Sequence, residues 1–106
     1  MVWELKETNE FEKEFDKIPS DIKKRFEDQF RQVEKDPYSI GKPLGYKWFR
    51  ELKNQGWRVY YLIYDNKIIV LFVGVSDKKG QQAVINILKH NLKMFKEFIE
   101  KGEKKL

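Results

Sequence analysis

The sequence predicts an α+β domain in which helices pack on a mainly antiparallel sheet. Apolar residues recur first with a strand period, then twice with a helical period, then in three strand-like runs, and finally with a helical period again. This order is β-α-α-β-β-β-α, and the short turns between the three consecutive strands are typical of a β-meander. With 41% apolar residues, including three Trp, five Tyr and eight Phe among 106 residues, the chain can build one core. Residues 1–106 are therefore expected to form a single domain.

The N-terminal third predicts a strand followed by a helical hairpin. Residues 2–6 alternate like a short strand, and Asn9 with Glu12 three positions later resembles a capping box. The first helix then has a stripe of apolar residues at helical spacing: Phe11, Phe15 and Ile18. Pro19 ends that helix. Because the connection is short, the next helix should pack antiparallel to the first.

The second helix begins at Ser20-Asp21, where either side chain can cap it. Its apolar stripe consists of Ile22, Phe26, Phe30 and Val33. Asp36-Pro37 ends this helix, and residues 38–45, with two Gly and one Pro, are expected to be a loop.

Three strands are predicted in the middle of the chain, followed by one helix. Residues 46–53 alternate, the segment 54–56 supplies a hairpin loop with a glycine, and residues 57–64 form the next strand. Residues 68–75 are apolar without alternation, which is typical of a strand covered on both faces. A single helix of about five turns should start near residue 80; its stripe consists of Val84, Leu88, Leu92, Phe95 and Ile99.

The charge distribution indicates a basic surface in the middle of the chain. The net charge is +5, and eleven of the seventeen acidic residues lie in residues 4–36, whereas residues 37–96 hold only three. A basic surface fits nucleic acid, an acidic protein or a membrane surface. The absence of cysteine, of an apolar leader and of any apolar run longer than residues 68–73 predicts a cytoplasmic protein with no membrane span.

The strongest candidates for chemistry are three cations. Arg58 follows a Gly-Trp pair at the start of a strand, where its guanidinium could donate two parallel hydrogen bonds to a phosphate. Alternatively, Arg58 is an exposed strand residue that pairs with Glu51 across the hairpin. Lys78 and Lys79 lie between the last strand and the last helix, where the helix N-terminus would reinforce phosphate binding. The sequence does not choose between these two lysines, and an ordinary solvated turn is the other interpretation.

Further cations and aromatic residues suggest that the polyanion is RNA. Lys47, Arg50 and Lys53 lie on the first hairpin strand, with Arg50 on the opposite face from the two lysines. Most strand aromatics are expected in the core, but one or two tyrosines, for which Tyr60 and Tyr61 are the candidates, could stack on bases. No nucleotide-binding glycine motif or nucleophile-elbow motif is present, and the lone histidine excludes a multi-histidine metal site, so no metal or cofactor is predicted.

The span from Phe11 to about Leu92 resembles the RelE/ParE superfamily of toxins from type II toxin–antitoxin systems. The resemblance is carried by F-x-K-x-F-D-K-I-P at 11–19, K-P-L-G at 42–45, F-R-E-L-K at 49–53, G-W-R-V-Y-Y at 56–61, V-L-F-V-G at 70–74 and D-K-K at 77–79. The order β-α-α-β-β-β-α is also that of the family. The resemblance implies a RelE-like fold and a cognate antitoxin as partner.

RelE-like members are endoribonucleases that cut mRNA on the ribosome, using the 2′-hydroxyl of the RNA to attack the adjacent phosphate. The resemblance gives Arg58 the role of the family's phosphate-binding arginine, and Lys78 or Lys79 that of a second cation. Two family lysines fall on Phe49 and Glu51, and Arg50 or Lys53 would have to substitute for them. A C-terminal family tyrosine falls near Val84 or Ile85, so the usual acid and base have no counterpart.

Three functions follow from the resemblance. The first is a ribosome-dependent mRNA endoribonuclease that inhibits translation. The second is a ParE-like inhibitor of DNA gyrase, and the third is an inactive remnant that binds only its antitoxin. In each case the antitoxin is expected to offer an acidic or amphipathic segment that covers the basic patch.

Overall fold

The computed structural model describes residues 2–102, which form four helices and five strands. In chain order these are β1 (Glu4–Glu7), α1 (Asn9–Asp16), α2 (Ser20–Lys35), β2 (Lys42–Pro43), β3 (Phe49–Asn54), β4 (Trp57–Tyr64), β5 (Ile69–Asp77), α3 (Gln81–His90) and α4 (Leu92–Lys101). The strands make one sheet in the order β1-β5-β4-β3-β2. Only β1 pairs in parallel, with β5, and the other neighbours are antiparallel. The predicted α+β class with a mainly antiparallel sheet is confirmed.

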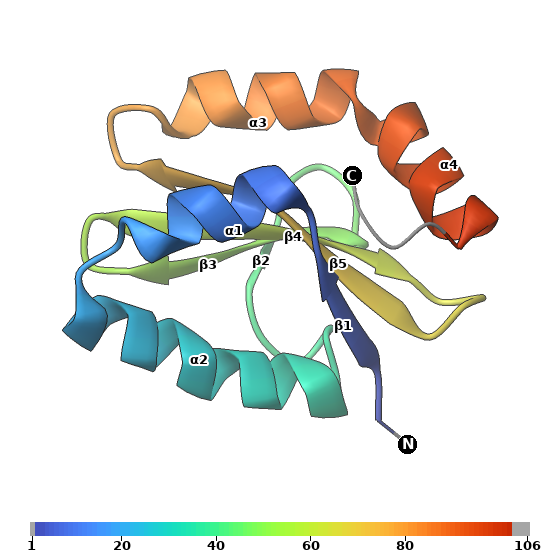
Figure 1. Cartoon of the computed structure of the whole chain (residues 1–106), viewed down its shortest axis with the longest axis horizontal. Helices are drawn as coiled ribbons and strands as arrows, with labels where there is room; N and C mark the ends of the chain where they lie inside the picture. Colours follow the sequence, from blue (N-terminus) through green and yellow to red (C-terminus); the bar gives the residue numbers. More distant parts are fainter. Residues whose placement is uncertain (1, 103–106) are drawn as a thin grey trace.

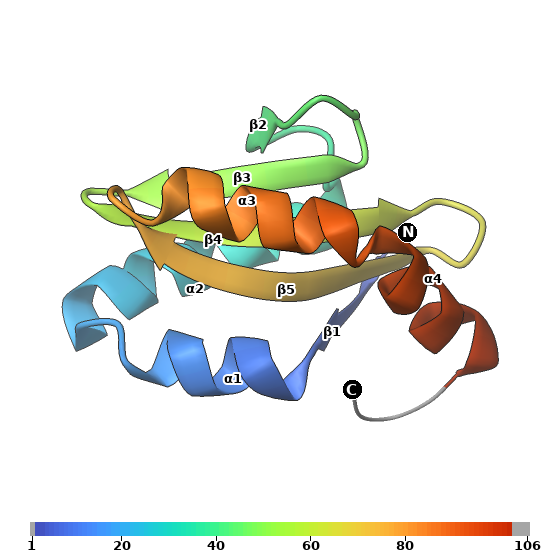
Figure 2. The same cartoon turned by 90° about the horizontal axis from the view of Figure 1, so that it is seen from above.

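Helices cover both faces of the sheet, so the domain has two cores (Figures 1 and 2). One core packs α1 and α2 against alternate residues of β4 and β5, and the other packs α3 and α4 against the opposite face. As a result, β4 and β5 are buried over almost their whole length. The prediction of a strand covered on both faces at 68–75 is therefore confirmed, although β4 occupies the middle of the sheet.

The helical hairpin forms as predicted, but its caps differ. Thr8, not Asn9, caps α1, because the Thr8 hydroxyl accepts a 3.0 Å hydrogen bond from the Phe11 amide. The predicted side-chain cap at Ser20-Asp21 is wrong: α2 begins at Ser20 after Pro19, and no side chain accepts a hydrogen bond there. Aromatic packing joins the two helices, since the Phe15 ring lies 5.5 Å from that of Phe30.

The first hairpin strand is shorter than predicted. Residues 46–48 belong to the preceding loop, and β3 begins only at Phe49. Lys42–Pro43, which was expected in a loop, adds a short edge strand opposite Glu51 and Arg50. A proline is tolerated there because an edge strand does not need every backbone donor.

The single C-terminal helix that was predicted is two helices, with a break at Asn91 (Figure 1). The Asn91 side chain donates to the Ile87 carbonyl at 3.0 Å. The chain direction changes at this residue, which lets Ile85 and Leu88 pack in the same core as Phe95 and Phe98. Periodicity alone did not reveal the break, because the apolar stripe continues through it.

A bulge in β5 decides which residues face α3. Tyr60 pairs with Gly74, whereas Tyr61 pairs with Phe72, so Val73 is an additional residue in β5. The residues after the bulge are thereby shifted to the other face, and Ser76 lies beside Tyr60 under α3. Helix α3 packs closely here, since a Cβ built on Gly74 would lie only 3.0 Å from Leu88 Cδ1.

Candidate functional site

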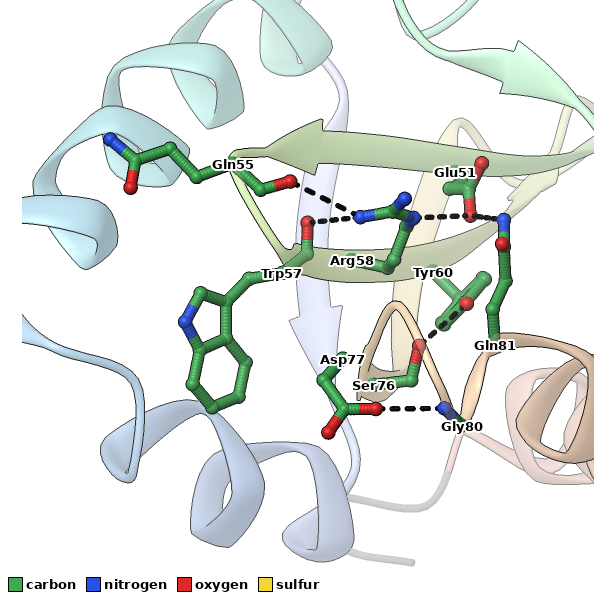
Figure 3. Close-up of polar contacts among 9 residues, drawn as sticks. All are labelled: Glu51, Gln55, Trp57, Arg58, Tyr60, Ser76, Asp77, Gly80 and Gln81. Carbon is green, nitrogen blue, oxygen red and sulfur yellow. Dashed lines mark hydrogen bonds and ion pairs between the residues drawn. The ribbon is translucent and has the colours of Figure 1, made fainter.

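A buried polar cluster lies where β3 and β5 end, β4 begins and α3 starts (Figure 3). We call it the Arg58 cluster, and its members are Glu51, Arg58, Tyr60, Ser76 and Gln81. The sheet register brings it together, because Lys53 is opposite Arg58 on one side and Ser76 is opposite it on the other. Glu51 and Arg58 are both buried, which is unusual for charged residues.

Arg58 and Glu51 form the ion pair at the centre of this cluster. Arg58 Nε lies 3.6 Å from Glu51 Oε1, and the two side chains are only 5% and 4% exposed. Of the alternatives for Arg58, pairing with Glu51 is confirmed, although both residues are buried rather than on the surface. Arg58 Nη1 also donates to the backbone carbonyls of Gln55 at 3.3 Å and Trp57 at 3.5 Å.

The ion pair is imperfect on the arginine side. Within the described residues, Arg58 Nε is a buried donor with no hydrogen-bond partner. Glu51 Oε1 instead accepts a 2.6 Å hydrogen bond from Gln81 Nε2 on α3. An orphaned buried donor in a native fold calls for an explanation, and one explanation is a site that completes its bonding with a ligand.

Tyr60 and Ser76 close the inner side of the Arg58 cluster. Their hydroxyls are 2.8 Å apart. Burial raises the pKa of Tyr60 to about 12, and the hydrogen bond with Ser76 only partly opposes this effect. Tyr60 is therefore a neutral hydroxyl at physiological pH.

Three exposed lysines lie above the buried arginine at the same end of the sheet. Lys53 is the cross-strand neighbour of Arg58, and Lys78 and Lys79 form the turn from β5 to α3. The Asp77 carboxylate accepts a 2.7 Å hydrogen bond from the Gly80 amide and fixes this turn. The structure thus places Arg58 and the three lysines at one end of the sheet, with the arginine buried and the lysines exposed.

Lys47 and Arg50 do not join this group. Lys47 is exposed, but it precedes β3 at the opposite end of the sheet. Arg50 is only 8% exposed, so its guanidinium is not open to RNA in this structure. Its guanidinium donates to backbone carbonyls of the 38–47 loop: those of Tyr38, Ile40, Gly41 and Lys47, at 2.9 to 3.5 Å.

The two tyrosines expected to stack on bases are also core residues. Tyr60 and Tyr61 are both 0% exposed, so neither ring presents a face on which a base could stack in this structure. Tyr61 points into the core beside α2, and its hydroxyl donates to the carbonyls of Pro37 and Ile40. Strand alternation could not reveal this burial, because helices cover both faces of the sheet: α1 and α2 pack over Tyr61, and α3 and α4 pack over Tyr60.

Gln81 and Ser76 belong to the Arg58 cluster but were not predicted. Gln81 carries no charge, and Ser76 reaches the cluster only because of the bulge at Val73. The only signal in the sequence was Glu51 in a strand of otherwise basic and apolar residues.

A groove lies at the far end of the sheet, away from the Arg58 cluster. It has a volume of about 570 Å³ and is lined by Trp48, Ile63, Tyr64, Asp65, Asn66, Leu92, Lys93 and Lys96. Its floor is apolar and its rim carries both signs of charge. The groove is separated from the Arg58 cluster by most of the length of β3 and β4.

Residues 2–102 contain no group of three or more His, Asp and Glu side chains that could hold a metal ion. In the same part of the chain, no helix has the length and apolar character needed to cross a membrane.

The chain is similar in fold to solved structures of toxins and toxin–antitoxin complexes. A double mutant of the E. coli toxin RelE in the free state superposes with a TM-score of 0.71 at 20% identity, over 85% of this chain and 98% of that chain. A chain of the intact E. coli RelBE toxin–antitoxin complex superposes with a TM-score of 0.65 at 22% identity, over 72% of this chain and 96% of that chain. A chain of the archaeal RelE-RelB complex from Pyrococcus horikoshii superposes with a TM-score of 0.61 at 15% identity, over 74% of this chain and 97% of that chain. At these identities the superpositions establish the fold.

No curated protein sequence matches the chain. The family described as ParE toxin of type II toxin-antitoxin system, parDE, matches residues 5–81. This match covers well over half of the 106 residues and includes the Arg58 cluster and the lysine turn. The chain is therefore a type II toxin–antitoxin system toxin and belongs to the RelE/ParE superfamily.

Proposed function

We propose that this toxin is a ribosome-dependent mRNA endoribonuclease that inhibits translation in the cytoplasm. The observation that supports the proposal is the convergence of Arg58, Lys53, Lys78 and Lys79 on one end of the sheet, beside the N-terminus of α3. The three exposed lysines and the positive end of a helix dipole form a surface suited to a phosphodiester, and Arg58 is buried at the same end of the sheet.

In the proposed reaction the 2′-oxygen of the RNA attacks the adjacent phosphorus, and the bond to the 5′-oxygen breaks. The 2′-hydroxyl loses its proton and the 5′-oxygen gains one, so the products are a 2′,3′-cyclic phosphate and a 5′-hydroxyl. Negative charge accumulates on the phosphorane oxygens, where preorganised cations lower the barrier. Lys78 and Lys79 would meet the substrate at the surface, and Arg58 Nε is a donor that a phosphate oxygen could engage.

Arg58 can reach a phosphate only if the cover over it opens. Glu51 and Gln81 lie beside it, and their 2.6 Å hydrogen bond joins β3 to the start of α3. In our proposal the incoming phosphate takes the place of the Glu51 carboxylate as the anion beside Arg58. The chain then supplies phosphate binding, and the ribosome contributes part of the alignment of the 2′-hydroxyl.

We further propose a cognate antitoxin that covers the lysine end of the sheet. Support comes from the family and from the toxin–antitoxin complexes that share this fold. An acidic segment would neutralise the three exposed lysines and hold the Arg58 cluster closed.

A second candidate, inhibition of DNA gyrase by binding, has one observation in its favour. The matching family is described by the ParE toxin, and Phe49 and Glu51 occupy the positions where RelE-like enzymes have strand lysines. Binding alone would require no acid or base.

Mapping of mRNA cleavage on translating ribosomes by primer extension tests the proposal. The wild type should cut within decoding-site codons, and a Lys78→Ala/Lys79→Ala variant should not. A matched control is Lys24→Ala, which removes an exposed lysine from α2 on the other side of the molecule. Growth arrest without any cuts, accompanied by inhibition of gyrase supercoiling, would transfer the assignment to the second candidate.

A further inference from the structure

Tyr46 and Trp48 form a stacked aromatic pair in the loop before β3. Their ring centroids are 4.5 Å apart and the ring planes differ by only 16°. Trp48 packs on the hydrophobic cores, whereas Tyr46 is 47% exposed. Since the indole covers one face of the phenol ring, the exposed area of Tyr46 is on its other face and edge. A flat ring is thus presented to solvent on a buried support.

The loop that carries this pair is held rigidly. Arg50 donates to the Lys47 carbonyl at 3.0 Å and to the Gly41 carbonyl at 2.9 Å. The Leu44 amide donates to the Phe49 carbonyl, and the Phe49 amide donates to the Tyr46 carbonyl. A ring held in this way loses little conformational freedom when a ligand stacks on it.

Two lysines lie near the exposed ring. Lys47 is the next residue in the loop and is exposed. Lys89, near the end of α3, is close to the loop, because a Cβ built on Gly45 would lie 3.5 Å from its Nζ. Figure 2 shows the loop between β2 and β3 near the end of the sheet where α3 turns into α4. An aromatic face with cations beside it fits a base together with its phosphates.

We infer that Tyr46, supported by Trp48 and flanked by Lys47 and Lys89, is a base-stacking platform for single-stranded RNA. This inference rests on the proposed RNA-directed function and adds a second contact to it. Helix α3 connects the two sites: Gln81 lies in the Arg58 cluster and Lys89 lies beside the platform. Eight residues of helix span about 12 Å. A stacked strand covers that distance with roughly four nucleotides, since each rises about 3.4 Å.

The alternative occupant of this surface is a protein. A protein interface is expected to bury a broad apolar core with few charges. Here one ring is exposed between two lysines, and Tyr46 is not among the residues that line the nearby apolar groove. The observations therefore favour RNA.

The test is the affinity of the full-length protein for a fluorescein-labelled single-stranded RNA decamer, measured by anisotropy at several salt concentrations. We expect Tyr46→Ala to raise the dissociation constant about 10-fold without changing the salt dependence, because the substitution removes stacking and no charge. Tyr46→Phe keeps the ring and should bind within about 2-fold of the wild type. Lys47→Ala should instead reduce the salt slope by about one.

Equal binding by the wild type and a folded Tyr46→Ala variant would overturn the platform, and so would a wild type that binds no RNA. Loss of antitoxin binding, with RNA binding intact, would assign the surface to protein recognition instead. The proposed nuclease is judged separately by cleavage on ribosomes. RNA binding that depends on Tyr46 supports the platform even if no mRNA is cut.

Discussion

The buried pair of Arg58 and Glu51 makes a strong prediction about stability. Arg58→Met removes one partner and leaves the Glu51 carboxylate, 5% exposed, without its counter-charge. At the observed 3.6 Å, the attraction between unit charges is about 4–5 kcal/mol for an effective dielectric constant of 20. Breaking a buried pair typically costs about 3–5 kcal/mol. Because a domain has only about 5–15 kcal/mol of stability, we expect Arg58→Met to be severely destabilising.

Replacing both partners should restore most of this loss. In Glu51→Met/Arg58→Met no charge remains buried. The remaining cost is the loss of the hydrogen bond from Gln81 and of the two longer bonds from Arg58 to the carbonyls of Gln55 and Trp57, together worth about 1–3 kcal/mol. Urea unfolding followed by tryptophan fluorescence would give the four free energies of the double-mutant cycle. We expect a coupling energy of at least about 2 kcal/mol.

Lys53→Met is the matched control, because Lys53 is opposite Arg58 in the register but exposed. It should change the stability by less than about 0.5 kcal/mol. If Glu51→Met and Arg58→Met each lowered the free energy of unfolding by less than about 1 kcal/mol, and if their effects were additive in the double variant, the expected energetic coupling between Arg58 and Glu51 would be refuted. Arg58→Ala should destabilise the fold for the same reason, so toxicity assays of Arg58 variants need a stability measurement beside them.

Other predictions concern the lysine turn, the bulge and the buried tyrosines. Lys78→Ala/Lys79→Ala should abolish growth arrest while shifting the urea midpoint little, since both lysines are exposed; full arrest by this variant would exclude them from the site. Gly74→Ala should cost about 1–3 kcal/mol in urea unfolding, because its Cβ would meet Leu88 at 3.0 Å, whereas Gly56→Ala, with nothing within 4 Å, should be close to neutral. Burial raises the pKa of Tyr60 and of Tyr61 from 10.0 to about 12, so the native state retains these protons where the unfolded chain loses them. The stability they contribute is present below pH 10.0 and falls between pH 10.0 and about 12; Tyr60→Phe should flatten this decline, and an unchanged pH profile would contradict it.

The order of the elements was predictable because it depends on local periodicity. The stripe Ile22, Phe26 and Val33 forms the buried face of α2, and the boundaries of β4 agree with the prediction at both ends. The turn at residues 55–56 separates two strands whose pairing needs no information from distant parts of the chain. Local signals of this kind survive folding, because tertiary packing reinforces them.

Features that depend on contacts between distant residues were not predictable. Arg50 is a basic residue in an alternating segment, and only the fold shows that four loop carbonyls surround it. Tyr60 and Tyr61 alternate as in a half-exposed strand, but helices from both ends of the chain cover the two faces. The bulge at Val73 left no recognisable signal, although it decides that Ser76 faces α3.

The candidate site was predicted in its charges but not in its architecture. Lys78 and Lys79 follow Arg58 by about twenty residues in the chain. The antiparallel pairing of β4 with β5 brings the three residues to the same end of the sheet. Their spacing along the sequence was therefore sufficient to place them together. The depth of Arg58 was not predictable, because it depends on how α3 lies over the sheet.

The parallel pairing of β1 with β5 has a consequence for synthesis of the chain. Glu4 is opposite Ile69, so the first strand has no partner until more than half of the protein has left the ribosome. The hairpin of β3 and β4 needs only neighbouring residues, and we expect it to fold first. Pulse-labelled hydrogen exchange during refolding should show amides of β4 protected before those of β1. A chain interrupted before residue 69 would lack β5 and both lysines of the turn, so it could not form the proposed site.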